Sequence, residues 1–215
     1  MHAAPPTKPF VVLRFDVDYR EPHGLALAEI VHKYGLHGSF YFRHRAGGFS
    51  LDVMRAVAAL GHEVGYHFET LDLCRGDFDR AAALFLDHIQ LLRNAGLEIR
   101  TAAAHGSPST APTYTRNLDL LVQRPNLLEQ AELLGETTLN VDFARVPYVS
   151  DANWRWRRYA HFEPDTVGVP TTLRAVTQHP DAALYINFHP QQWFARPLST
   201  LYFRTRNRIG RQVRR

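Results

Sequence analysis

The sequence has few of the features that anchor a protein in a membrane or cross-link it covalently. Its 215 residues include one cysteine, Cys74, so neither an intramolecular disulfide nor a cysteine-based metal site can form. No stretch approaches the roughly 18 apolar residues of a membrane span, and the first ten residues hold no basic segment followed by an apolar run. We therefore expect a cytoplasmic protein in which imidazole and carboxylate groups hold any metal ion. Twelve histidines make such a site feasible.

Acidic residues are absent from the C-terminal residues 204–215, which are rich in arginine, whereas the rest of the chain is slightly acidic. The sequence predicts one domain over residues 1–203 and an arginine-rich tail over 204–215. The tail is compatible with weak contact with a membrane surface, although a solvated terminus is the simpler interpretation. No base-stacking aromatic residues are interleaved with these arginines, so we expect no nucleic-acid partner.

Short strand-like runs alternate with amphipathic segments along the chain. The predicted strands are 10–18, 37–43, 62–68, 99–106, 137–143, 146–150 and 183–189. The predicted helices are 24–35, 50–61, 77–96, 126–135 and a segment that begins at about Thr171. Strand followed by helix, repeated, predicts an α/β domain with a parallel sheet that is either open or closed into a barrel.

Polar residues gather at the ends of the predicted strands. They are Asp16 and Asp18 on the first strand, His67 and Glu69 on the third, His105 on the fourth and His189 on the last. The carboxyl ends of parallel strands lie at one rim of a sheet, so we expect these residues to converge. Within each close pair the two residues are two positions apart and share a face of their strand.

The chemistry of this set favours a metal site, but the residues alone leave an alternative open. Asp16 and Asp18 would repel each other unless a cation lies between them, or unless one has a raised pKa and serves as a base. A mixture of aspartate and histidine suits zinc or another first-row divalent ion, and zinc with three protein ligands and an open position suits hydrolysis. The simpler alternatives are a solvated strand end for the aspartates and a hydrogen-bonded structural role for His67.

Six segments resemble a known family. In order and spacing, "LRFDVD", "GSFYFR" and "LGHEVGYHFETLDL" resemble the opening motifs of the polysaccharide deacetylases, the NodB-homology group of carbohydrate esterases. The later "AAAHGSP", "VPYVSDANWRW" and "LYINFHPQQW" resemble a bacterial subgroup of polysaccharide-deacetylase-like proteins. The resemblance covers about residues 11 to 194. It implies a distorted (β/α) barrel of the NodB-homology type, which removes acetyl groups from N-acetylated sugars with a divalent metal, expected to be zinc.

The resemblance also implies roles for individual residues. Asp16 matches the catalytic base, Asp18 and His67 match metal ligands, and His189 matches the general acid that protonates the leaving amine. Asp151 and Trp154 fall where the family has an acid and a tryptophan that orient the base and wall the pocket. Arg43 follows the second strand at the same rim and is a candidate substrate contact.

The sequence departs from the family's pattern at two places. The family's second metal-binding histidine, four residues after the first, is Leu71 here, which cannot bind a metal. His105 is the preferred third ligand because it ends the adjacent strand, and Glu69 is the runner-up because it shares a face with His67. The family's arginine-proline motif is replaced by "HGSP", so its substrate contacts cannot be transferred to this chain.

The sequence therefore predicts a metal-dependent hydrolase of carbon–nitrogen, not peptide, bonds that deacetylates an amino-sugar substrate. The expected cytoplasmic location favours a nucleotide-linked or lipid-linked sugar. Two alternatives stay open: a metal-independent hydrolase of another, cyclic amide, and a catalytically silent barrel that binds a glycan or a partner. The missing second histidine favours the silent barrel, whereas the presence of both Asp16 and His189 argues against it.

Overall fold

Strands and helices alternate through the first half of the chain. The computed structural model describes residues 10–106, 116–160, 163–164, 167–178 and 183–193, so the predicted tail at 204–215 lies outside the described residues. The strands are β1 (Phe10–Val17), β2 (Ser39–Phe42), β3 (Glu63–Phe68), β4 (Thr101–Ala104), β5 (Gly135–Glu136), β6 (Tyr148–Ser150), β7 (Arg157–Ala160), β8 (Glu163–Pro164) and β9 (Ala183–Phe188). The α-helices are α1 (Glu21–Lys33), α2 (Leu51–Ala59), α3 (Thr70–Leu73), α4 (Phe78–Asn94), α5 (Asp119–Gln123), α6 (Leu127–Gln130) and α7 (Val169–Gln178). Two 3-10 turns, η1 (Ala152–Trp154) and η2 (Pro190–Gln192), follow β6 and β9.

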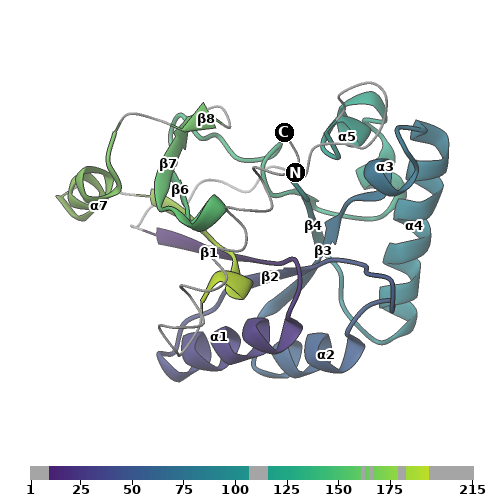
Figure 1. Ribbon diagram of the computed structural model, residues 1–215, viewed down its shortest axis with the longest axis horizontal. Coiled ribbons are helices and arrows are strands. Elements are labelled where there is room, and N and C mark those ends of the chain that lie inside the picture. The colour runs from purple at the N-terminus through teal and green to yellow at the C-terminus, as the bar shows by residue number, and fades with distance from the viewer. Residues whose placement is uncertain (1–9, 107–115, 161–162, 165–166, 179–182, 194–215) are drawn as a thin grey trace, which may run out of the picture.

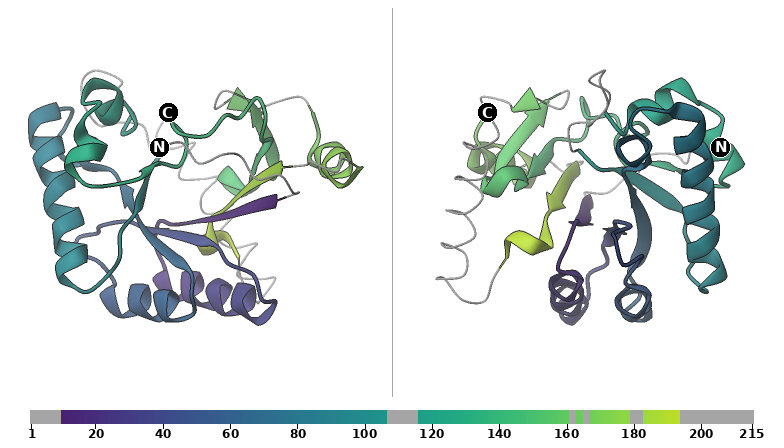
Figure 2. Two further views of the ribbon diagram at one scale, coloured as in Figure 1. Left: turned by 180° about the vertical axis from the view of Figure 1, so that it is seen from behind. Right: turned by 45° about the vertical axis from the view of Figure 1, so that its right-hand side comes forward.

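The described strands form one curled, nine-stranded sheet in the order β5-β4-β3-β2-β1-β9-β6-β7-β8. Neighbouring strands from β5 to β6 in this order run parallel, whereas the β6–β7 and β7–β8 pairs are antiparallel. Helices α1, α2 and α4 lie along the outside of β1 to β4 (Figures 1 and 2). The α/β class and the distorted barrel are confirmed, but the prediction of a parallel sheet is wrong for β7 and β8.

The two faces of the central strands carry different chemistry, because successive side chains of a strand point to opposite faces. On the outer face Phe15 stacks on Phe40 and on Phe188, with ring centroids 4.2 and 5.0 Å apart. Phe15 and Phe40 belong to the apolar core and Phe188 packs against it; residues of α1, α2 and α4 complete this core. Asp16 and His67 alternate with the core residues and are therefore directed to the inner face, where the polar groups of several strands meet.

Two predicted elements in the second half are wrong. Residues 137–143 form turns rather than a strand, because the buried carboxylate of Glu136 accepts hydrogen bonds from the backbone N–H groups of Thr138 and Leu139. This local capture of N–H groups competes with pairing in a sheet. The predicted helix at 126–135 is reduced to α6, since Glu132 adopts a left-handed backbone with φ of 51°.

Within the described residues, no helix combines the length and the apolar character that crossing a bilayer requires.

Candidate active site

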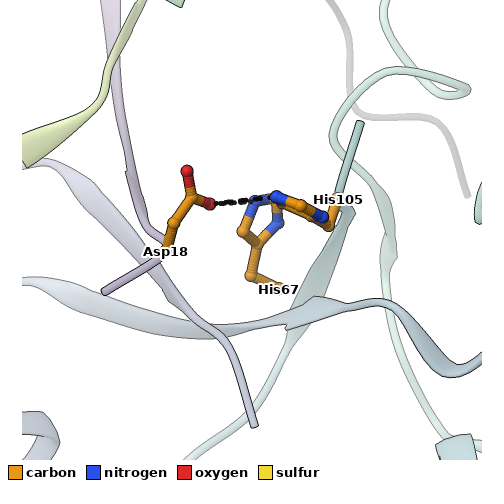
Figure 3. Close-up of side chains that lie close together, drawn as sticks. All are labelled: Asp18, His67 and His105. Carbon is orange, nitrogen blue, oxygen red and sulfur yellow. Dashed lines mark ion pairs between the residues drawn. The ribbon is translucent and has the colours of Figure 1, made fainter. Parts of the chain in front are cut away.

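Three side chains from three strand ends point toward one position at the rim of the barrel (Figure 3). Asp18 follows β1, His67 lies in β3 and His105 follows β4. Asp18 Oδ1 is 3.2 Å from His67 Nε2 and 3.5 Å from His105 Nε2. All three ligand atoms lie within 4.8 Å of one another. In a tetrahedral zinc site with bonds of about 2.0 Å, neighbouring ligand atoms lie about 3.3 Å apart, so the spacing suits one ion.

The hydrogen bonds around these residues direct lone pairs at that position. His67 Nδ1 is 2.9 Å from the carbonyl oxygen of Ala103, which can only accept, so Nδ1 carries a hydrogen and Nε2 is the ligand atom. Asp18 Oδ1 is buried and accepts no hydrogen bond from any described residue. An oxygen and a nitrogen lone pair that face each other across 3.2 Å need a proton or a cation between them. The donor set therefore fits a divalent ion.

His105 is suited to ligation because it is neutral. Burial lowers its pKa to about 3; the opposing effect of Asp18 is smaller than that of burial, and the proximity of His67 and Arg43 lowers the pKa further. Burial alone would raise the pKa of Asp18, but the proximity of His67 and His105 holds it well below its ordinary value. The cluster thus offers an ionised carboxylate and a neutral imidazole, which are the protonation states that bind metal.

Asp16 is fixed beside this cluster by residues on the inner face of the sheet. The Arg14 guanidinium donates to both carboxylate oxygens, at 2.7 and 2.8 Å, and Asn187 Nδ2 donates to Oδ2 at 2.9 Å. Burial would raise the pKa of Asp16, but Arg14 and, to a smaller extent, His67 and His189 lower it below its ordinary value. The raised pKa considered as an alternative to a cation is therefore not found, because each aspartate has its own positive or polar partner.

His189 lies beside Asp16 and is held by a hydrogen bond to Asp151. Its Nδ1 is 2.6 Å from Asp151 Oδ1, and the same carboxylate accepts from the backbone N–H of His189 and from Trp193 Nε1. Burial alone would lower the pKa of His189, but the hydrogen bond to Asp151 and the charges of Asp18, Asp151 and Asp16 together raise it to about 9. His189 is therefore protonated at neutral pH, with Nε2 4.0 Å from Asp16 Oδ2.

A cavity of about 350 Å³ opens over this arrangement. Asp16, His105 and His189 contribute to its wall. Its other described lining residues come from β1, β4, β6, β7 and β9, from the 3-10 turn η1 and from the loops after β4 and β5: Arg14, Ala104, Gly106, Arg116, Leu118, Thr138, Tyr148, Ser150, Ala152, Tyr159 and Asn187. The volume lies within the range of small-ligand pockets, which is about 300–1,000 Å³.

Several residues expected at the site have other contacts. Asp151 orients His189 and not Asp16, whose orientation depends on Arg14 and Asn187. Trp154 does not line the cavity; its backbone N–H donates to the side chain of Gln192.

Arg43 and Glu69, at the ends of β2 and β3, were expected to contact substrate and to serve as the alternative metal ligand, but they contact other groups. Arg43 does not line the cavity either, and its guanidinium contacts Glu69 and His105. Glu69, the alternative ligand, is bonded to that arginine and is not part of the cluster. Leu71 is fully buried in the apolar core.

Arg14 and Asn187 are functional candidates that the sequence reasoning missed. They lie directly opposite each other on β1 and β9, and each precedes a site residue by two positions. The signal was available, because a charged residue inside an apolar strand needs a buried partner and the residue two positions along shares its face. Arg14 in "VVLRFDVD" meets both conditions with Asp16.

Comparison with protein-family models and with curated proteins finds no match to this sequence. Comparison with solved structures does find similar folds. A CE4 family pseudoenzyme from Bacillus anthracis superposes with a TM-score of 0.54 at 16% identity, over 99% of this chain and 66% of that chain. A family 4 carbohydrate esterase from Streptomyces lividans, in complex with acetate, gives 0.50 at 14% identity, over 94% and 88%. The catalytic domain of a peptidoglycan N-acetylglucosamine deacetylase from Eubacterium rectale gives 0.51 at 15% identity, over 95% and 87%.

These similarities concern the fold. A mutant of the Bacillus anthracis pseudoenzyme with restored enzymatic activity matches with a TM-score of 0.53 at 15% identity, over 99% of this chain and 68% of that chain. Active and inactive proteins therefore share the architecture, and activity has to be argued from the residues of the site. The chain has the fold of the family 4 carbohydrate esterases, as the resemblance of its motifs implies.

Proposed function

We propose that the protein is a divalent-metal-dependent hydrolase that removes N-acetyl groups from an amino-sugar substrate, with zinc as the expected ion. The observation that carries the proposal is the placement of an ionised carboxylate, Asp16, and a protonated imidazole, His189, within 4.0 Å of each other at a cavity. The potential metal ligands lie directly beside them. Hydrolysis of an amide needs a base for the attacking water and an acid for the leaving amine, and this pair can supply both.

Asp18, His67 and His105 would hold the ion. When bound, a divalent ion in such a site polarises the carbonyl group of the amide and makes water more acidic. This assistance suits Asp16, because a carboxylate with a lowered pKa is a weak base that needs an acidic proton donor.

The chain's own residues prepare the proton transfers. Arg14 and Asn187 fix both oxygens of Asp16, so that Oδ2 faces the rim where His67 Nε2 lies 3.9 Å away. Asp151 accepts the hydrogen on His189 Nδ1, which leaves the hydrogen on Nε2 available to the leaving nitrogen. Because both groups are locked by buried partners, little reorganisation is required when the substrate arrives.

The cavity supports a substrate of limited size. About 350 Å³ accommodates one sugar ring with its N-acetyl group, and Tyr148 and Tyr159 in the cavity wall offer aromatic contacts to it. The remainder of the substrate would lie outside the cavity. A nucleotide-linked or lipid-linked amino sugar is the substrate class that we propose, in a cytoplasmic setting.

The test is release of acetate from N-acetylglucosamine oligomers and from nucleotide-linked N-acetylglucosamine. We expect turnover by protein purified without chelator, its loss on chelation and its return when zinc is added. Asp16→Asn should lower kcat by at least about 10²-fold while one metal ion stays bound, because removing the base does not touch a ligand. Asp52→Asn, which removes a fully solvated carboxylate on α2, is the matched control and should leave kcat unchanged.

Two other outcomes would replace this proposal. Turnover of a cyclic amide by protein that elemental analysis shows to be metal-free would indicate a metal-independent hydrolase. Sugar binding without any turnover, in protein loaded with metal, would indicate a silent barrel. The second outcome has an observation in its favour, since the position at which the resemblance requires a histidine holds the core residue Leu71.

A further inference from the structure

Arg43 and Glu69 form an ion pair that reaches into the metal cluster. Arg43 follows β2 and Glu69 follows β3, so both lie at the rim. Arg43 Nη2 donates to Glu69 Oε2, and Nη1 lies 3.2 Å from His105 Nε2. The same Glu69 oxygen is 3.6 Å from the other ring nitrogen of His105, Nδ1. His105 is therefore flanked by a cation on one nitrogen and a carboxylate on the other.

The contact between Arg43 and His105 has only one chemical interpretation. A guanidinium group has five N–H donors and no acceptor, so His105 Nε2 must supply its lone pair to Arg43. The hydrogen of the neutral ring is then on Nδ1, on the side of Glu69. Nε2 is also the atom of His105 that lies 3.5 Å from Asp18 Oδ1 and completes the ligand cluster. One lone pair cannot serve both Arg43 and a metal ion.

We propose that Arg43 competes with the divalent ion for His105 Nε2. Arg43 bonds this nitrogen, the third ligand atom, until the ion displaces it. This inference rests on the metal site of the proposed function. With Arg43 turned away, the lone pair of His105 Nε2 can bind the ion, and Glu69 remains to accept the hydrogen on Nδ1. A carboxylate in that position is a usual partner of metal-binding histidines, because it fixes the tautomer and the ring orientation.

The surroundings of Arg43 permit this exchange. Its Nε is buried and has no hydrogen-bond partner among the described residues, so the present position leaves one of its donors unsatisfied. Its side chain is 21% exposed, which gives the guanidinium a route to solvent. The two carboxylates of Glu69 and Asp18 lie on either side of His105 and attract whichever cation is present. Arg43 thus lowers the affinity for the ion both by repulsion and by occupying a ligand.

The experiment measures zinc affinity in competition with a chelating dye, on metal-free protein. Arg43→Met should lower the Kd for Zn²⁺ at least about tenfold, because a positive charge and a competing hydrogen bond are removed together. Arg124→Met is the matched control, since Arg124 is also paired with a carboxylate, Asp79, but on the surface. Its Kd should equal that of the wild type. Arg43→Gln, with an expected change in the same direction, replaces Arg43→Met if circular dichroism shows the latter to be unfolded.

A second pair of variants tests whether Arg43 acts through His105. In the His105→Ala background the effect of Arg43→Met should shrink to less than about threefold, because the contested nitrogen is gone. One bound zinc per wild-type chain with no tightening in either Arg43 variant would overturn the competitor role and leave the metal site standing. No zinc binding by the wild type or by either variant would overturn the metal site and, with it, this inference.

Discussion

The carboxylate of Asp151 is the group that sets the proton affinity of His189. It accepts from His189 Nδ1, from the backbone N–H of the same residue and from Trp193 Nε1. A buried imidazole would ordinarily be neutral, yet this hydrogen bond and the nearby negative charges raise its pKa to about 9. The proposed general acid therefore owes its protonated state to a residue that does not line the cavity.

The change Asp151→Asn should lower the pKa of His189, because it removes a negative charge but keeps the shape of the side chain. We expect the alkaline limb of the pH profile of kcat/KM to move toward acid by at least about one pH unit. An NMR titration of His189 in metal-free protein measures the same shift directly. Asp79→Asn, which neutralises an exposed carboxylate, is the control. An unchanged alkaline limb and an unchanged titration in Asp151→Asn would refute this role.

The same pKa shift predicts the sign of a stability change. Because the pKa of His189 is raised from 6.5 in the folded protein, its protonation stabilises the fold fully below pH 6.5, and this stabilisation is lost as the pH rises through about 9. The difference in unfolding free energy between wild type and Asp151→Asn should therefore shrink between pH 6.5 and pH 10. Urea unfolding of metal-free protein at the two pH values gives this difference.

At the scale of single residues the sequence predicted which groups meet, but not how each is held. Asp16, Asp18, His67, His105 and His189 come together because their strands are parallel neighbours or end at the same rim. Their partners differ in how far they could be predicted: Arg14 lies two positions from Asp16 on the same strand, whereas Asn187 bonds Asp16 from β9, and no local pattern reveals the register of that strand pair. The contacts of Arg43 depend on side-chain directions in loops, which strand periodicity does not determine.

At the scale of elements, Asn117 connects α3 with the segment that carries His105. Its side chain is fully buried. Nδ2 donates to Asp72 Oδ2 at 2.9 Å and to the carbonyl of His105 at 3.1 Å, and Oδ1 accepts from the backbone N–H of Asp72 at 3.1 Å. Asn117 therefore links α3 to the residue that supplies the third ligand, without contacting the metal position itself.

Asn117→Ala should weaken zinc binding by about 10-fold or more, because His105 loses the hydrogen bond that fixes its backbone. The unfolding free energy should fall by about 1–3 kcal/mol, since buried polar groups of Asp72 and His105 are left without this partner. Zinc titration and urea unfolding are the two measurements. Asn94→Ala removes an exposed hydrogen bond to Gln90 on α4 and should change neither quantity. Equal zinc affinity in Asn117→Ala and wild type would show that α5 and its flanking loop do not position His105.

The elements that sequence periodicity predicted well are those whose stability is local. Helix α4 begins after the predicted cap Asp77, whose carboxylate accepts from the N–H of Arg80, and Gly96 follows it with a positive φ of 83°. The sequence did not predict the short helix α3, because its four residues are too few to show a helical repeat of apolar positions. The turns after Glu136 were mistaken for a strand because the buried carboxylate that organises them is a tertiary feature.

For the whole molecule, polar and aromatic side chains from separate strands pack against one another at the inner face of the sheet. The Arg14 guanidinium lies 5.7 Å from the centre of the Tyr41 ring, and Tyr41 OH is 2.7 Å from Thr101 Oγ1. Tyr41 is almost completely buried. The position of Arg14, and through it that of Asp16, thus depends on how closely β3 approaches this ring. Sequence patterns could predict the α/β class, and the family resemblance the distorted barrel, but neither could predict this packing, because it joins side chains from strands far apart in the chain.

Gly65 on β3 makes the close approach possible, and Gly65→Ala tests it. A Cβ atom at this position would lie 2.3 and 2.5 Å from two ring carbons of Tyr41 and 3.0 Å from the carbonyl oxygen of Thr101. Strand propensity alone predicts that alanine stabilises β3, because glycine weakens the interior of a strand. The packing predicts the opposite sign, a loss of about 1–3 kcal/mol of unfolding free energy, since the enclosed Tyr41 ring has to move.

Urea unfolding shows whether Gly65→Ala raises or lowers the unfolding free energy. Gly47→Ala is the control, because a Cβ there meets nothing within 4 Å, and its unfolding free energy should stay within about 0.5 kcal/mol of the wild type. Gly65→Ala should also lower kcat, since a displaced Tyr41 shifts the guanidinium that orients Asp16. A Gly65→Ala protein as stable and as active as the wild type would mean that the barrel interior tolerates repacking, and that the alignment of the base does not depend on it.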